Sequence, residues 1–275
     1  MTISLRAAGT ATPSGTAVTA VSPNVPTGTT TGDISILAVV AKPYTTAITT
    51  PSGWSKITEY AEGTTATSAA DVGSSKVALY FKISASVGAI GNIGQSGANA
   101  MSAHITSYQK TGTTWDVGSY TQGGDVVSDA NYAATAQSGV SAGAGDWIYA
   151  ATGVSGDVGT VSVQSVAGMS GATLGSTVNR TNTGSTTGND IKILVSDRPV
   201  SSGSSTAAPT YTYTNASATT GTTVWLRLRE YTATLTPPTF VAEYETSFNT
   251  TTTPKTIDVT TAVGDLLILA AYAVD

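Results

Sequence analysis

The segment GDISILAVVA, residues 32–41, is the strongest indication of the fold, because two near-copies of it occur further along the 275-residue chain. The copies are GDWIYAATGV, residues 145–154, and GDLLILAAYA, residues 264–273. Each copy is a continuous apolar run with the length of a buried β-strand, and each follows small residues that favour a turn. We therefore interpret three Gly-Asp pairs as structural turn motifs that lead into buried strands: Gly32 and Asp33, Gly145 and Asp146, and Gly264 and Asp265.

Two further landmarks follow the first two copies in the same order. The apolar part of KVALYFKIS begins at Val77, 45 residues after the first Gly-Asp glycine, and that of DIKILVSDR begins at Ile191, 46 residues after the second. Two later strands end at Tyr108 and Tyr231, which lie 76 and 86 residues after the same glycines. These spacings predict an internal duplication whose second unit carries an insertion of about ten residues.

The pattern between these landmarks predicts an all-β, antiparallel protein. Apolar and polar residues alternate in VALYFKI and TVWLRLREY, whereas no window shows the 3.6-residue period of an amphipathic helix. We expect a duplicated β-sandwich or jelly-roll-like module over residues 1–234, with repeat units of about 1–118 and 119–234. An alternative is that each unit of this length forms its own sandwich.

A proline pair near the end of the chain predicts a boundary. TLTPPTF cannot continue a paired central strand, so we assign a linker to residues 235–238. Residues 239–275 would then begin a further, incomplete β module that contains the third Gly-Asp strand. Two explanations stay open: the chain is part of a longer protein, or a neighbouring subunit completes the module by strand addition.

Composition excludes several classes of function. Only 11 % of the residues are charged and the net charge is −5, without a basic run, which disfavours nucleic-acid binding. The chain contains no cysteine, and no apolar run reaches the roughly 18 residues of a membrane span. The first residues lack the apolar core of a signal peptide. No membrane insertion is expected.

Few residues could carry catalysis. His104 is the single histidine, and we interpret it as a structural residue on an exposed or half-buried strand face. One histidine and no cysteine disfavour zinc, and the aspartates match no calcium-binding loop. We therefore predict no catalytic residue, no metal site and no cofactor. A glycosidase or esterase built from carboxylates that meet only in three dimensions is a minor alternative.

Aromatic residues in or beside loops are the remaining candidates for ligand contact. Trp54 in PSGW, Trp115 in TTWD and Tyr120 in GSY have rings that could stack on sugars. Local packing or subunit contact would explain the same residues. The sequence thus names these three as possible glycan-binding residues.

The first repeat resembles a group of bacteriophage virion proteins built from Ser-, Thr- and Gly-rich β-sandwich modules. Members of this group share a Gly-Asp pair entering an apolar strand, a P-x-G-W element, an aromatic strand with one basic residue, and a closing alternating strand. The likeness covers residues 30–108 and weakens over 140–231, where no P-x-G-W occurs. The residues that carry it are Gly32 and Asp33; Pro51, Gly53 and Trp54; Tyr80, Phe81 and Lys82; and Tyr108.

This resemblance implies a non-enzymatic structural protein of a phage particle, made in the host cytoplasm. A tail-fibre or tail-associated component is the first expectation, and a capsid decoration or head-fibre protein is the alternative. The implied partners are other virion proteins, further copies of this chain, with a trimer favoured, and a host-surface glycan. A carbohydrate-binding module or adhesin is the competing hypothesis from another functional class.

Overall fold

The computed structural model describes residues 2–13, 20–65, 73–83, 90–96, 100–156, 164–184 and 190–231. These residues belong to one compact unit, Met1–Thr232, and the rest of the chain forms a second unit, Ala233–Asp275. The expected linker at 235–238, the further module at 239–275 and the turn residues Gly264 and Asp265 all lie outside the described residues. Within those residues every helix or strand element is a β-strand, and all sheet pairings are antiparallel, so the predicted fold class is confirmed.

The first large sheet is built from the first repeat. Its strands lie in the order β1-β9-β4-β7-β6, and β2 pairs with β9 beside β1. Strands β4, β7 and β9 contain the three landmarks of that repeat. The bounds are β1 Ser4–Ala8, β2 Thr12–Pro13, β4 Ile34–Lys42, β6 Ser55–Ala61, β7 Lys76–Ile83 and β9 Ala100–Gln109.

The second large sheet is built mainly from the second repeat and has the corresponding order β11-β18-β13-β17-β16. Strand β10 also pairs with β18, β12 and β15 pair with β17, and β14 pairs with β18. The bounds are β10 Thr114–Asp116, β11 Tyr120–Thr135, β12 Ala142–Gly143, β13 Trp147–Ser155, β14 Ser165–Ala167, β15 Ala172–Leu174, β16 Val178–Gly184, β17 Ile191–Ser205 and β18 Thr210–Tyr231.

Strand pairing corrects two of the landmark equivalences. Ile34 faces Tyr108 in β9, whereas Trp147, at the same distance from its Gly-Asp pair, faces Leu228 in β18. Tyr108 therefore corresponds to Leu228 and not to Tyr231. The count from sequence was wrong because β18 continues past this point, and Tyr231 pairs with β10.

The second correction concerns the start of the third central strand. Ile34 faces Ile83 in β7, and Trp147 faces Pro199 in β17. Counting back along both strands, Val77 corresponds to Ile193, two residues after the predicted equivalent, Ile191. A shift of two residues keeps the same side chains on the same face, so the alternating pattern could not detect it.

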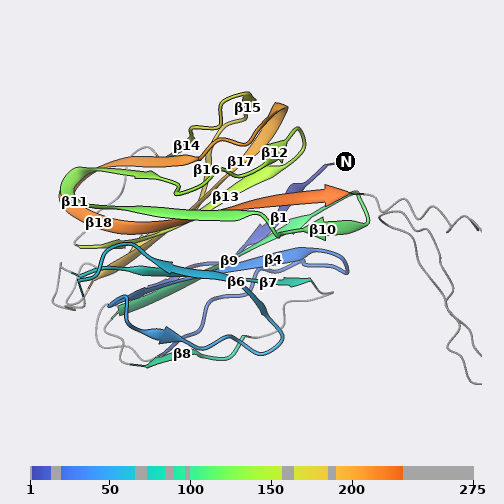
Figure 1. Ribbon diagram of the computed structural model, residues 1–275. Helices are drawn as coiled ribbons and strands as arrows, with labels where there is room; N and C mark the ends of the chain where they lie inside the picture. Colours follow the sequence, from blue (N-terminus) through green and yellow to red (C-terminus); the bar gives the residue numbers. More distant parts are fainter. Residues whose placement is uncertain are drawn as a thin grey trace, which may run out of the picture. The chain divides into compact units, whose positions relative to one another are not determined.

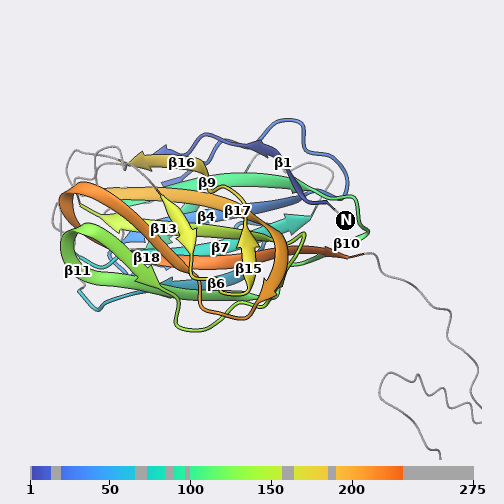
Figure 2. The same cartoon turned by 90° about the horizontal axis from the view of Figure 1, so that it is seen from above.

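The two large sheets pack face to face around a shared core, as Figures 1 and 2 show. Alternate residues of the central strands point into this core, which explains why it draws equally on both repeats. From the first sheet it contains Ile34, Ile36, Ala38, Val40, Val77, Leu79 and Tyr108. From the second sheet it contains Tyr149, Ala151, Ile191, Ile193, Val195, Val224, Leu226 and Leu228.

The outer faces of both large sheets are covered as well, which explains why the Gly-Asp strands are apolar on both faces. A small sheet, ordered β3-β8-β5, covers the first sheet (Figure 1). Its strands are β3 Ala20–Val21, β5 Ala47–Ile48 and β8 Ile93–Ser96. Val21, Ile48 and Ile93 pack there with Leu37 and Val39 of β4 and with other residues.

The second sheet is covered by its own long hairpin. Strands β11 and β18 pair along their length, bend, and fold back over the outer face, as the green and orange ribbons of Figures 1 and 2 show. Tyr132, Tyr211 and Tyr213 from the folded-back part pack with Ile148 and Trp225 of the sheet. Both sheets are therefore interior layers of the unit.

Candidate functional site

Each of the two described Gly-Asp pairs closes a four-residue turn, and the two turns have the same geometry. In the turns 30–33 and 143–146, the last N–H donates to the first carbonyl, at N···O distances of 3.1 and 3.0 Å. The third residue of each turn, Gly32 or Gly145, has a φ of +90° or +91°. These values match a type II turn, whose third position favours glycine because a side chain would be strained there.

The aspartate carboxylates hold these turns. Oδ2 of Asp33 accepts the N–H of Thr30 at 2.8 Å and the Nε–H of Arg6 at 2.9 Å. Oδ2 of Asp146 accepts the N–H of the first residue of its own turn and the Nη2–H of Arg229, both at 2.7 Å. Each carboxylate therefore fixes a turn and links it to another strand, which is a structural role.

Trp115 is part of the inner core. Its side chain is 8 % exposed, and its Nε1–H donates to the carbonyl of Gly32 at 2.7 Å. The ammonium of Lys110 lies 5.8 Å from the ring centroid. Trp115 thus connects β10 to the first Gly-Asp turn, and its burial leaves no open ring face for a sugar. The prediction of sugar stacking at Trp115 is not supported by this geometry.

The other two predicted aromatic residues lie in different surroundings. Tyr120 is 41 % exposed at the start of β11, whereas Trp54 is only 6 % exposed and packs under the small outer sheet. Trp54 and Trp115 belong to different core clusters, so the structure does not bring the predicted residues together. Of the three, only Tyr120 offers an accessible ring.

The PSGW element nevertheless borders a surface hollow of about 260 Å³. Residues 51–54 form a further type II turn, in which the Trp54 N–H donates to the Pro51 carbonyl at 3.1 Å and Gly53 has a φ of +76°. The hollow is bordered by this turn, by β7 and by the residues directly before β8. Its lining includes Pro51, Ser52, Trp54, Lys82, Ile90 and Asn92.

A turn of the same type precedes β15 in the second repeat, but strand pairing places it about five residues ahead of the position that matches the PSGW turn. In residues 169–172 the Ala172 N–H donates to the Met169 carbonyl at 3.2 Å, and Gly171 has a φ of +88°. Met169 is buried in the outer cluster of the second sheet, as Trp54 is in that of the first. Only the Ser-Gly pair is common to both turns, and that signal alone is too short to identify.

A buried polar network links the two large sheets. The hydroxyl of Tyr108, from β9, donates to Oδ2 of Asp197, from β17, at 2.6 Å. Arg180 of β16 binds the same carboxylate through both Nε and Nη2, at 2.6 and 2.8 Å. Its guanidinium lies 5.9 Å from the ring centroid of Trp147. Asp197 and Tyr108 are fully buried, so this network joins the sheets out of reach of a substrate.

Burial and charge set the titration of these groups. Burial raises the pKa of Asp197, and the hydrogen bonds from Arg180 and Tyr108 oppose that rise. Burial and the negative charge of Asp197 raise the pKa of Tyr108 well above its usual range. Tyr108 therefore remains a neutral hydrogen-bond donor to Asp197, and Asp197 and Arg180 form a structural ion pair.

His104 is fully buried, which corrects the expected position on an exposed or half-buried face. Its Nε2 lies 3.0 Å from the carbonyl oxygen of Gly9, and its Nδ1 lies 3.3 Å from Oγ1 of Thr106. A neutral ring protonated at Nε2 satisfies both contacts. Burial lowers the pKa of His104 to about 4, a shift to which the nearby Arg180 charge adds and which the Gly9 contact opposes.

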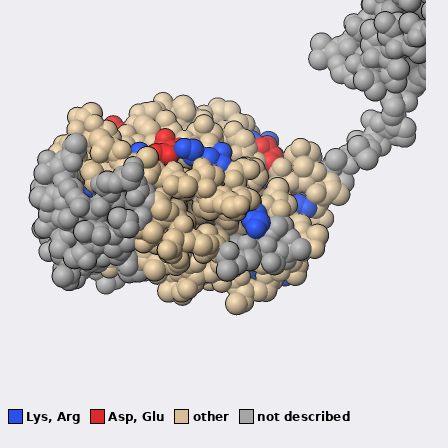
Figure 3. Space-filling view, turned by 90° about the horizontal axis from the view of Figure 1, so that it is seen from below, with Lys and Arg blue, Asp and Glu red and all other residues tan. Residues whose placement is uncertain are grey.

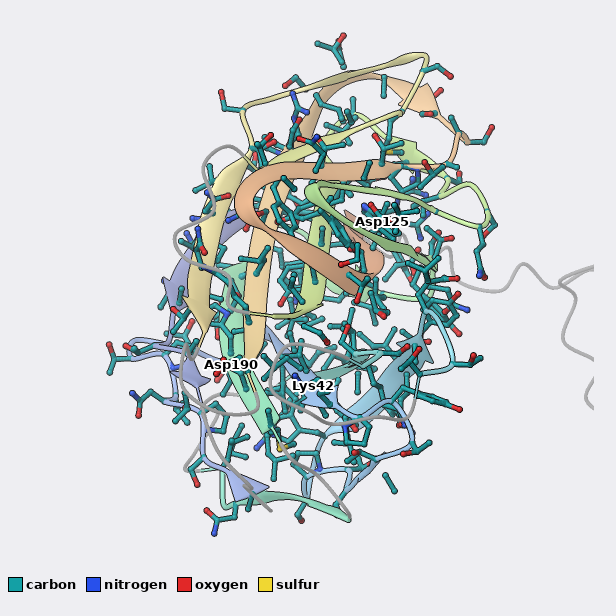
Figure 4. The ribbon with its side chains drawn as sticks, turned by 90° about the vertical axis from the view of Figure 1, so that its left-hand side faces the viewer. Lys42, Asp125 and Asp190 are labelled. Carbon is teal, nitrogen blue, oxygen red and sulfur yellow. The ribbon has the colours of Figure 1, made fainter. Side chains whose placement is uncertain are left out.

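Three other acidic or basic residues are labelled in Figure 4. Asp125 lies at the bend of β11, where its carboxylate accepts the N–H groups of Val127 and Ala133, both at 2.9 Å. Lys42 and Asp190, at the end of β4 and just before β17, are buried. Asp125 stabilises the hairpin that covers the second sheet.

Among the residues that the structure describes, no three His, Asp or Glu side chains are placed to share a metal ion. Within the same ranges no helix has the length and apolar character needed to cross a membrane. No known protein family, curated protein or solved structure matches this chain.

Proposed function

We propose that this protein is a non-enzymatic structural component of a bacteriophage particle, in first place a tail-fibre or tail-associated protein. One observation carries the proposal: three of the residues responsible for the resemblance to virion modules, Asp33, Trp54 and Tyr108, have structural roles in this fold. Asp33 holds a turn, Trp54 packs an outer cluster, and Tyr108 ties the two large sheets together. In the proposed particle, these contacts would hold together a module that is repeated along a fibre.

The charged residues support a structural role. Figure 3 shows a face of the described unit on which Lys, Arg, Asp and Glu occupy only a small part. Four arginines are used in ion pairs that join one strand or turn to another. These pairs are Arg6 with Asp33, Arg180 with Asp197, Arg227 with Asp116, and Arg229 with Asp146.

The sheet edges indicate how such a module would meet its neighbours. Strands β1, β6, β11 and β16 lie at the edges of the two large sheets, and each contains a register shift in its pairing. Bulged edges resist the addition of a further strand. The end strands β10 and β12 of the second sheet have no such shift but are only three and two residues long, and short edge strands are likewise poor templates for a further strand. In the proposed particle, subunits would therefore meet through faces and loops, in a homo-oligomer for which a trimer is our expectation.

Labelling of purified phage particles tests this proposal. An antibody raised against residues 1–30 is expected to label the tail in negative-stain images. Label on the capsid would instead favour the decoration or head-fibre alternative, and absence of the chain from purified particles by mass spectrometry would refute both. A carbohydrate-binding role has a separate observation in its favour, the hollow beside Trp54.

A further inference from the structure

We propose that the PSGW hollow binds a single anionic, hydroxyl-bearing unit of a cell-surface glycan. The inference rests on the proposed contact with a host surface and names the ligand class for that contact. Among the described residues that line the hollow, Lys82 is the cationic side chain and none is acidic. Ser52 and Asn92 add a hydroxyl and an amide to the same hollow. This set of groups suits a negative charge that carries neighbouring hydroxyls.

The polar groups of the hollow are held by ordered structure. Lys82 belongs to β7, where it pairs with Ser35 of β4. A Cβ placed on Gly53 would lie 3.9 Å from the Lys82 Nζ, so the ammonium lies beside the PSGW turn. Oδ1 of Asn92 accepts a hydrogen bond from the Ser22 hydroxyl at 2.6 Å, which orients the amide. Such preorganisation lowers the entropic cost of binding.

The size of the hollow and the burial of Trp54 restrict the mode of binding. About 260 Å³ is below the roughly 300–1,000 Å³ of typical ligand pockets, which limits the occupant to about one sugar ring. Because Trp54 is only 6 % exposed, it forms a wall of the hollow and cannot serve as a stacking platform. Specificity must therefore come from the polar groups, with Pro51 and Ile90 as further apolar walls.

Two sources supply this chemistry: a uronic acid, through its carboxylate, and a glycerol phosphate unit, through its phosphate. Isothermal titration of the 275-residue chain would use a glucuronic-acid-containing tetrasaccharide, a glycerol phosphate trimer and neutral maltotetraose. We expect one anionic probe to bind with a Kd of about 1 mM or below, and we expect no binding of maltotetraose. The binding should weaken as salt is added, because the site is partly exposed.

Two variants connect binding to the hollow. Lys82→Gln removes the charge and should weaken binding on the order of tenfold. Gly91→Phe should abolish it, because Gly91 lines the hollow and a Cβ added there has no atom within 4 Å, so the larger side chain can be accommodated without a backbone clash. Lys56→Gln is the matched control, since Lys56 pairs with Glu59 on β6 and does not line the hollow.

The outcomes separate this inference from the proposed function. It is overturned if maltotetraose binds as well as the anionic probes, if neither anionic probe binds at about 10 mM, or if correctly folded Gly91→Phe retains full affinity. If the particles carry the chain but no probe binds, glycan binding at the hollow is refuted and the virion proposal is not affected. Binding at the hollow by a chain absent from particles would refute the virion proposal alone and leave a glycan-binding protein.

Discussion

The two large sheets use different side chains at the same place in their topology. In the first sheet, the bulge of β6 falls at Ile57, and Phe81 of β7 faces Ser55, two residues before the bulge. Both side chains are partly buried and pack against the shared core. In the second sheet, the bulge of β16 falls at Arg180, and the residue corresponding to Phe81 is Asp197. Two apolar side chains in the first repeat thus occupy the positions that carry a buried ion pair in the second.

The difference shows which part of the repeat the fold requires. Strand order and the position of the bulge are the same in both sheets, whereas the chemistry at the bulge is not. A buried ion pair is often no more stabilising than an apolar pair of similar volume, but it specifies its partners closely. Because Asp197 also accepts the Tyr108 hydroxyl, we interpret this pair as setting the alignment of the two sheets.

The largest effect is expected from Asp197→Ala. Removing the carboxylate leaves Arg180 and the Tyr108 hydroxyl buried without their main partner, which should cost about 3–5 kcal/mol of unfolding free energy. The triple variant Arg180→Ile, Asp197→Phe, Tyr108→Phe replaces the ion pair with the first-repeat residues Ile and Phe, removes the Tyr108 hydroxyl, and should recover most of that loss. Urea unfolding followed by tryptophan fluorescence measures both. A cost below about 1 kcal/mol for Asp197→Ala would contradict the alignment role.

The second-largest effect is a pH dependence of stability that arises because His104 is neutral in the fold. In the unfolded chain His104 takes up a proton near its ordinary pKa of about 6.5, but in the fold it does so only near 4. The unfolded chain therefore binds more protons between these pH values. The contribution of neutral His104 to the unfolding free energy is fully present above pH 6.5 and is lost as the pH falls towards 4. The expected loss is about 3 kcal/mol.

His104→Gln isolates this contribution from the titration of carboxylates. The variant retains a polar side chain but cannot titrate, so its stability should change less than that of the natural chain over the same pH range. Urea unfolding at several pH values from 7 to 4 measures the difference. Identical pH profiles for both proteins would show that His104 does not carry the effect.

A smaller effect concerns the Gly-Asp turns, which have the same geometry in both repeats. Asp33→Ala and Asp146→Ala each remove a carboxylate that holds a turn and pairs with an arginine, and each should cost about 2 kcal/mol. Because the two turns have the same geometry, the costs should agree within about 0.5 kcal/mol. The Asn variants retain an acceptor for the turn and should cost less. Thermal unfolding measures all four, and strongly unequal costs would argue against equivalent roles.

The sequence predicts the central part of this fold and loses precision away from it. Gly32 and Gly145 identify the two central strands, because a turn before a fully apolar run has few other interpretations. The equivalences of Ile191 and Tyr231 were wrong because strand length and the bend of β18 depend on pairing partners distant in the chain. Local spacing carries no information on such partners.

The candidate site was less predictable, for a related reason. Trp54 and Trp115 follow turn-forming residues and look accessible in the sequence, yet packing from other strands buries both. Lys82 was part of the recognised pattern, but only the fold places it with Asn92 around one hollow. The cross-sheet pair of Tyr108 and Asp197 joins residues 89 positions apart, and no motif signals it.

The smallest effect is the difference in stability cost between glycine substitutions in two turns, 51–54 and 169–172. Gly53→Ala should cost about 1 kcal/mol, because its φ is positive but the added Cβ meets only the Lys82 Nζ at 3.9 Å. Gly171→Ala meets the backbone oxygen of Ser204 at 2.7 Å, so it should cost about 1 kcal/mol more.

Urea unfolding of the two glycine variants measures this difference. A larger cost for Gly171→Ala would show that close backbone packing requires glycine in the second turn, whereas the open surroundings of Gly53 tolerate alanine. Equal costs for Gly53→Ala and Gly171→Ala would mean that backbone strain alone decides both turns. The close approach of the Ser204 backbone oxygen would then add nothing measurable to the cost at Gly171.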